Sequence, residues 1–137
     1  MSDKAWFYLE SRGDILFASL HGSWDHKIDM EYLRALDKAA NDFRDRPWGM
    51  LIDMRDWQLL TYEGLKSGEE YASTEFSRRN QTTECWVVPH SMVRSLMLQS
   101  ASFPPGLSFK SFEDMTLAEH WLKSQPPAYE QSTEQND

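Results

Sequence analysis

The sequence predicts a single α/β domain with a mixed, mostly parallel sheet and the element order β-β-α-β-α-β-α-β-α. Two observations predict this class. Two apolar runs on either side of Gly13 are typical of an opening β-hairpin. After them, short strands of buried type alternate with longer amphipathic stretches, and right-handed crossovers turn that alternation into parallel strands. The chain has 137 residues, a length that fits one domain.

The predicted hairpin consists of the segments "AWFYLE" (5–10) and "DILFASLHG" (14–22). Gly13 lies between them and can adopt the positive φ that a tight turn needs. In the second segment, apolar residues alternate onto both faces of the strand. This pattern predicts an inner strand that is covered by other parts of the chain on at least one side.

A first helix is expected within "SWDHKIDMEYLRALDKAANDFRDRP" (23–47), with Asp25 as its N-cap and Pro47 beyond its end. Apolar residues recur there at steps of three and four, which places them on one stripe of the helix. The stripe comprises Met30, Leu33, Leu36, Ala40 and Phe43. The next segment, "WGMLIDM" (48–54), is mostly apolar and predicts a short buried strand.

The second half of the chain continues the alternation of strand and helix. A second helix is expected over 61–80, where Thr61 can serve as the cap. The elements expected after it are a strand over 84–89, a short helix over 91–102, a strand over 107–112 and a final helix over 116–124. Thr116 and Glu119 have the spacing of a capping box at the start of that last helix.

The folded domain is expected to span residues 1–124. The remaining residues, 125–137, are rich in proline, glutamine and acidic side chains, a composition typical of a disordered tail. Cys85 has no second cysteine to form a disulfide with, and no apolar run approaches the roughly 18 residues of a membrane helix. The first residues lack the pattern of a signal peptide. Together these features indicate a cytoplasmic protein.

The charge of the chain argues against two classes of partner. It contains 22 acidic and 14 basic residues, which gives a formal net charge of −8. Proteins that bind nucleic acids usually present a basic surface that displaces counterions, so we expect no nucleic-acid partner. An acidic surface also opposes strong binding to anionic membranes, so membrane contact is expected to be transient at most.

Four stretches of the sequence together resemble a known family. They read "ILFASLHGSWD", "GMLIDMRDWQLLTYEGL", "CWVVPHSMVRSLMLQSASFPPG" and "FKSFEDMTLAEHWL". This combination resembles the SpoIIAA-like branch of the STAS domains, also called the STAS/CRAL-TRIO-like group, over residues 5–124. The resemblance implies a bacterial module with the SpoIIAA-like fold. Through the kinship of that group with CRAL-TRIO lipid-transfer domains, it also implies a lipid-like ligand.

The resemblance also implies a position for a regulatory switch. In the STAS proteins that antagonise anti-sigma factors, a kinase phosphorylates a serine directly before a Gly-Leu pair. Here Asp53 and Gly64 match the two ends of that loop, but Tyr62 and Glu63 replace the serine pair. Glu63 keeps a negative charge in the first turn of a helix, where it is favourable, but it cannot be switched. Signalling of the anti-sigma-factor-antagonist type, without the phosphorylatable serine, is therefore the alternative hypothesis; Thr61 and Tyr62 are other residues open to modification.

The sequence contains no pattern that fits a catalytic or metal site. Cys85 lies inside a predicted buried strand, where a thiol is normally an inert small hydrophobe. Ser91 follows His90 directly and is better explained as a helix cap than as a nucleophile. The four histidines are scattered, without H-x-x-x-H or C-x-x-C spacing: His21, His26, His90 and His120. We expect no enzymatic activity, no metal and no cofactor.

Aromatic residues supply the strongest indication of a binding site. They make up 13% of the chain, and Trp24, Trp57 and His90 all follow strands at their carboxyl ends. In open α/β sheets, ligands bind in the crevice outside those ends. The candidate face for a ligand or partner comprises Trp24, Trp57, Tyr62, Glu63, His90 and Phe103. We predict that it binds a small apolar or amphipathic, lipid-like ligand or a partner protein; completion of a small core is the simpler explanation for the other tryptophans.

Overall fold

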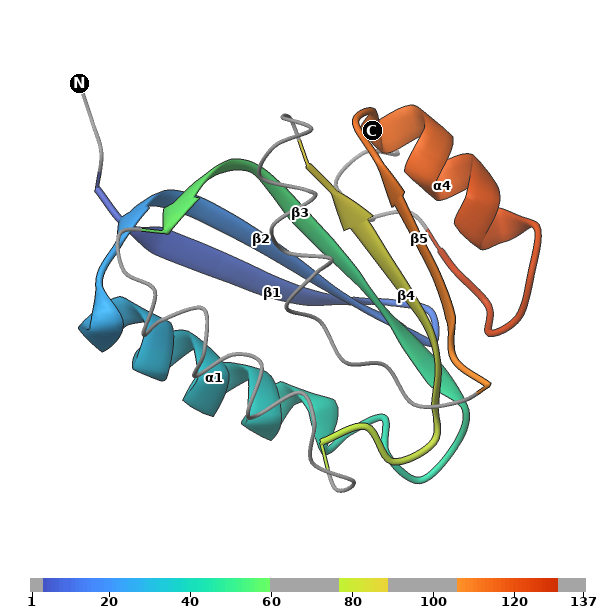
Figure 1. Ribbon diagram of the computed structural model, residues 1–137. Coiled ribbons are helices and arrows are strands. Elements are labelled where there is room, and N and C mark those ends of the chain that lie inside the picture. Colours follow the sequence, from blue (N-terminus) through green and yellow to red (C-terminus); the bar gives the residue numbers. More distant parts are fainter. Residues whose placement is uncertain (1–3, 60–76, 89–105, 131–137) are drawn as a thin grey trace, which may run out of the picture.

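The computed structural model describes residues 4–59, 77–88 and 106–130, and within them one sheet carries two helices (Figure 1). The elements are β1 (Trp6–Arg12), β2 (Ile15–Trp24), α1 (His26–Ala40), β3 (Trp48–Leu59), β4 (Gln81–Val87), β5 (Ser108–Phe112) and α4 (Met115–Lys123). The strands lie in the order β1-β2-β3-β4-β5. β1 is antiparallel to β2, and the other neighbours are parallel. The predicted mixed, mostly parallel sheet is confirmed.

The opening hairpin forms as its sequence predicts. Gly13 lies between β1 and β2 with a φ of 67°, the left-handed conformation that glycine adopts without strain. β2 is an inner strand between β1 and β3, and both of its faces are buried from Ile15 through Leu20. The expected helices over 61–80 and 91–102 lie wholly or mostly outside the described residues.

Both described helices begin with an aspartate N-cap. In α1, as predicted, the Asp25 carboxylate accepts a hydrogen bond from the Ile28 amide at 3.0 Å. In α4 the cap is Asp114, which accepts from the Leu117 amide at 3.2 Å, so the expected capping box at Thr116 is wrong. An upstream carboxylate can take the cap because the helix begins at Met115. In the described parts of the chain, neither helix has the length and apolar character needed to cross a bilayer.

The buried stripe of α1 differs from the predicted one by a small rotation of the helix. Met30, expected inside, is 38% exposed, and the buried positions are Asp29, Tyr32, Leu36 and Ala40. The rotation brings the Tyr32 ring against the sheet. Edge-to-face packing of large rings outweighs the burial of a flexible methionine at such a position. A carboxylate is thereby drawn into the interior beside it.

Two clusters of buried side chains lie on opposite faces of the sheet, and Figure 1 shows the two helices on opposite sides. On the α1 side, the cluster contains Leu16, Ala18, Leu20, Trp24, Tyr32, Leu36, Ala40, Phe43, Trp48, Met50, Met54, Trp86 and Val88. On the α4 side, it contains Ile15, Phe17, Leu51, Cys85, Val87, Ala118, Leu122 and Tyr129. α4 packs on β4 and β5. Among the described elements, no helix covers β1 on that same face of the sheet.

The segment 125–130 packs against the hairpin, unlike the disordered tail that its composition predicts. The Tyr129 hydroxyl accepts a hydrogen bond from Arg12 Nη1 at 3.0 Å and donates one to Glu119 Oε2 at 2.6 Å. The Asp14 amide donates to the Ala128 carbonyl at 2.7 Å. One buried aromatic ring with two polar partners outweighs the polar composition around it, so the ordered chain extends to at least residue 130.

We predict that a chain ending at Ser124 is less stable than one ending at Glu130. The shorter chain loses the buried Tyr129 ring, worth about 1.5–3 kcal/mol, and leaves Arg12 with one hydrogen-bond partner fewer. Urea unfolding of the two chains, followed by tryptophan fluorescence, measures the difference. Equal midpoints would show that the docked segment contributes nothing to stability.

Candidate functional site

A β-bulge in β3 decides which side chains meet at the carboxyl end of the sheet. Ser19 of β2 lies opposite Asp53, whereas His21 lies opposite Asp56, so β3 carries one extra residue between these pairs. Because side chains alternate between faces, the extra residue reverses the faces of the residues that follow it. Asp56 consequently turns to the α4 side with His21, and Trp57 turns to the α1 side.

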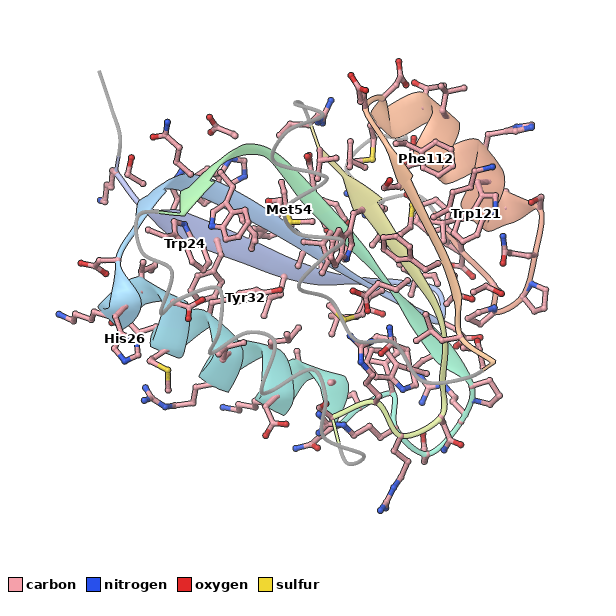
Figure 2. The ribbon with its side chains drawn as sticks, in the orientation of Figure 1. Trp24, His26, Tyr32, Met54, Phe112 and Trp121 are labelled. Carbon is pink, nitrogen blue, oxygen red and sulfur yellow. The ribbon has the colours of Figure 1, made fainter. Side chains whose placement is uncertain are left out.

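On the α1 side, Phe7, Trp24, Tyr32 and Trp57 form an aromatic cluster. Figure 2 labels two of its members, Trp24 and Tyr32. Trp24 is fully buried at its centre. Its ring centroid lies 5.9 Å from that of Trp57, with an interplanar angle of 89°, and 5.3 Å from that of Tyr32, with an interplanar angle of 68°. These edge-to-face contacts are the favoured geometry for aromatic pairs. The indole Nε1 of Trp24 donates to the His21 carbonyl at 2.8 Å, so Trp24 is a core residue that holds Trp57 in place.

Two buried polar atoms beside the aromatic cluster lack a hydrogen-bond partner in the described structure. They are the indole Nε1 of Trp57 and the Oδ2 of Asp29. A buried polar group without a partner destabilises a protein by about 1–3 kcal/mol. Asp29 is only 5% exposed, and desolvation raises the pKa of its carboxyl from 3.8 to about 6, against the opposing attraction of His26. Such unsatisfied groups are unusual in a core, and a strongly raised pKa is a feature of functional sites as well as of structural networks.

The structure brings together two of the six predicted site residues, Trp24 and Trp57. The other four lie outside the described residues: Tyr62, Glu63, His90 and Phe103. Asp29 was missed because its position on the helix was expected to face solvent. Its neighbour Met30 looked like the inward residue, and only the rotation of α1 reverses the two. Asp29 comes four positions after the N-cap Asp25, and the sequence around it gives no signal that an aspartate there is buried.

On the α4 side, hydrogen bonds between side chains link β2 to β3, and ring stacking joins β1 to them. The imidazole Nδ1 of His21 lies 3.0 Å from Asp56 Oδ2, and its Nε2 lies 2.9 Å from Ser19 Oγ. Trp6 of β1 stacks on the His21 ring, with centroids 3.9 Å apart and an interplanar angle of 10°. Sequence reasoning missed this group because His21 and Asp56 are 35 positions apart and meet only through the bulge.

The order of Ser19, His21 and Asp56 is that of a catalytic triad, but their surroundings are those of a structural clamp. The Asp56 side chain is 76% exposed, so solvent screens its charge. Ser19 lies inside a strand that is paired on both sides, so its backbone amide is part of the sheet and not of an oxyanion hole. These hydrogen bonds, with the stacking of Trp6 on His21, therefore join β1, β2 and β3 at this end of the sheet.

The other reactive groups of the described chain do not form a site. Cys85 is fully buried, and desolvation, with a smaller effect of Glu84, raises the pKa of its thiol to about 12. The thiol is therefore protonated and unreactive near neutral pH. No group of three or more potential metal ligands gathers within the parts of the chain that the structure describes.

Comparison with known proteins identifies the fold. No protein-family model matches the chain, and no curated protein matches it. Among solved structures, an uncharacterised protein of the DUF3478 family from Shewanella loihica, described as having a SpoIIAA-like fold, superposes with a TM-score of 0.62. It is 21% identical, and the match covers 89% of this chain and 98% of the other. The chain therefore has a SpoIIAA-like fold.

A second solved structure with this fold is an anti-sigma factor antagonist from Mycobacterium paratuberculosis. It superposes with a TM-score of 0.57 at 13% identity, over 90% of this chain and 97% of that one. In the SpoIIAA-like domain described here, the aromatic cluster and its two unpartnered polar atoms lie at the carboxyl ends of β2 and β3, and at the start of α1.

We predict that Asp29→Asn stabilises the domain at pH 7.5 and has no such effect below pH 4. The pKa of Asp29 is higher in the folded protein, about 6, than its ordinary value of 3.8, so the folded state holds the proton more tightly. Stability therefore falls as pH rises between these values, by about 1.4 kcal/mol per pKa unit or about 3 kcal/mol in all. Urea unfolding at several pH values measures the gain, with the exposed Asp42→Asn as control. A gain that did not change with pH would contradict this assignment.

Proposed function

We propose that this SpoIIAA-like module binds a small amphipathic, lipid-like ligand at the carboxyl ends of β2 and β3, on the α1 side of the sheet. The unpartnered indole N–H of Trp57, held against the aromatic cluster, carries the proposal. A buried tryptophan usually finds an acceptor for this group, and an oxygen atom of a ligand would supply one. The location outside the strand ends is the usual one for ligands of α/β sheets.

The chemistry of this region suits a ligand with an apolar body and a polar end. Its lining is mostly aromatic, and each 100 Å² of apolar surface removed from water contributes about 2.5 kcal/mol. The Trp57 N–H and the Asp29 carboxylate are the few polar groups that would orient such a molecule. A lipid-like compound combines both requirements, which supports it over a fully polar metabolite.

We further propose that the module is non-catalytic and acts in the cytoplasm. The protonated thiol of Cys85 and the clamp built from Ser19, His21 and Asp56 offer no activated nucleophile. The single buried cysteine is consistent with a reducing compartment. These features support a binding role in which the ligand is held and released unchanged.

We predict that gently purified protein carries a lipid-sized molecule and that Trp57→Phe carries less of it. The phenylalanine keeps an aromatic ring but removes the N–H donor, and a hydrogen bond lost to a buried group lowers affinity by about 1–3 kcal/mol, or 5- to 150-fold. Native mass spectrometry and lipid extraction measure occupancy. The control is Trp6→Phe, which removes an indole on the other face of the sheet. Empty protein whose melting temperature no fatty acid, fatty amine, fatty alcohol or phospholipid changes would refute the proposal.

A protein partner is the second candidate function. The similarity in fold to an anti-sigma factor antagonist supports it, and so does the acid Glu63 at the position where that group of proteins carries a phosphorylatable serine. A permanent negative charge there would suit constitutive binding or constitutive release of a partner, in place of a switched one.

We predict for this second function that Glu63→Ala and Trp57→Ala each weaken capture of the partner. Both substitutions alter the stretch that follows the bulge of β3, the first by removing charge and the second by removing a large ring. Affinity capture from lysate with quantitative mass spectrometry compares the two variants with wild type, and Asp42→Asn serves as the surface control. Identical sets of captured proteins would exclude this stretch as the interface.

A further inference from the structure

The position of Asp29 links a buried carboxylate to the aromatic cluster. Asp29 lies on the buried face of α1, one turn before Tyr32. Residues three positions apart in a helix are neighbours on its surface, so the carboxylate borders the Tyr32 ring. That ring packs edge-to-face on Trp24 at 5.3 Å, and Trp24 packs on Trp57 at 5.9 Å. A carboxylate and several aromatic rings therefore line the same region.

Among the described residues, no salt bridge pairs the Asp29 carboxylate with a lysine or an arginine. Its Oδ2 is buried without a hydrogen-bond partner in the described structure. The rings of the aromatic cluster that come from the sheet belong to Phe7 of β1, Trp24 of β2 and Trp57 of β3, and they carry no charge. On α1 itself, His26 is the group that exerts an electrostatic effect on Asp29. A carboxylate removed from water is retained at such a position only at a considerable loss of stability, unless a cation is supplied from elsewhere.

We infer that the ligand of the aromatic cluster is an amphiphile with an ammonium head group, which pairs with the Asp29 carboxylate. This inference rests on the proposed function and specifies the ligand class. Aromatic faces and a carboxylate are the combination that recognises ammonium groups, because the ring quadrupole and the anion both attract the cation. In a ligand that also carries an oxygen atom near the head group, the Trp57 N–H would donate to that oxygen, and the aliphatic tail would cover the exposed part of the Trp57 ring.

The same geometry disfavours the other common lipid head groups. A fatty acid would place a second carboxylate beside Asp29, and two like charges in a region of low dielectric repel strongly. A fatty alcohol carries no charge and would donate at most one hydrogen bond to the carboxylate, a weaker attraction than that of an ammonium group. The three head groups on one tail length therefore give a graded series, and Asp29 is the described residue that we expect to discriminate between them.

The test compares dodecylamine, dodecanol and dodecanoic acid, each below its critical micelle concentration, on three forms of the full chain. These are wild type, Asp29→Asn, which keeps the shape and removes the charge, and Glu31→Gln, which removes an exposed acid from the same helix. Binding is measured by quenching of tryptophan fluorescence and by native mass spectrometry. Near-ultraviolet circular dichroism verifies that each variant is folded.

Wild type is expected to bind dodecylamine at least tenfold more tightly than dodecanol, and dodecanoic acid more weakly than either. Asp29→Asn is expected to lose that tenfold preference for the amine, to change dodecanol binding much less than amine binding and to improve binding of the acid. Glu31→Gln should resemble wild type. Amine affinity of wild type should also fall as pH decreases from 7.5 to 5, because Asp29 takes up a proton in that range, whereas the affinity of Asp29→Asn should not.

The outcomes separate the inference from the proposed function. If all three compounds bind and Asp29→Asn changes amine binding no more than alcohol binding, the ammonium assignment is wrong and the lipid-binding proposal stands. If the acid binds wild type most tightly, the assignment is likewise wrong. If none of the three binds any form of the protein, the proposed function fails and the assignment fails with it.

Discussion

The register between β2 and β3, with the bulge that it contains, is the constraint on which the rest of the structure depends. These strands form the middle of the sheet, where both faces are buried and a shift of one residue would exchange core and surface side chains. Close approach at Gly49 holds the start of β3 in place, since a Cβ there would lie 2.8 Å from Ile15 Cδ1. The extra residue after Asp53 then directs Asp56 to one face and Trp57 to the other.

Buried polar groups at the two ends of this sheet differ in whether they have hydrogen-bond partners. Glu84, near the start of β4, is buried but accepts hydrogen bonds from Arg78 at 2.8 Å and from Trp86 at 2.7 Å. At the carboxyl ends of β2 and β3, by contrast, Asp29 and Trp57 each retain an atom without a partner in the described structure. Glu84 therefore has a hydrogen-bond donor for each of its carboxylate oxygens. Asp29 has one carboxylate oxygen without a donor in the described structure, at the place where a ligand is proposed to bind. Stability is commonly sacrificed in this way at functional sites.

Local signals predicted those parts of the fold that depend on neighbouring residues. The positive φ of Gly13 and the cap at Asp25 follow from short-range chemistry, and both are found. The predictions that failed needed distant contacts. The inward face of α1 depends on rings from β1 and β2 that receive Tyr32. The order of residues 125–130 depends on Tyr129 reaching Arg12, a contact between positions 117 apart.

The sequence by itself determined the class of fold, the hairpin, the mostly parallel sheet and the concentration of aromatic residues near strand ends. Periodicity, turn residues and caps carry that information within a few positions of the chain. The tertiary structure alone decided that Trp24 is a core support and that His21 meets Asp56. It also decided that Trp57 and Asp29 each keep an atom without a partner among residues 4–59, 77–88 and 106–130. The reason is physical. A one-residue bulge reverses the faces of all the residues that follow it in a strand. A small rotation of α1 turns Asp29 inward and Met30 outward. Neither displacement can be recognised from the local sequence pattern.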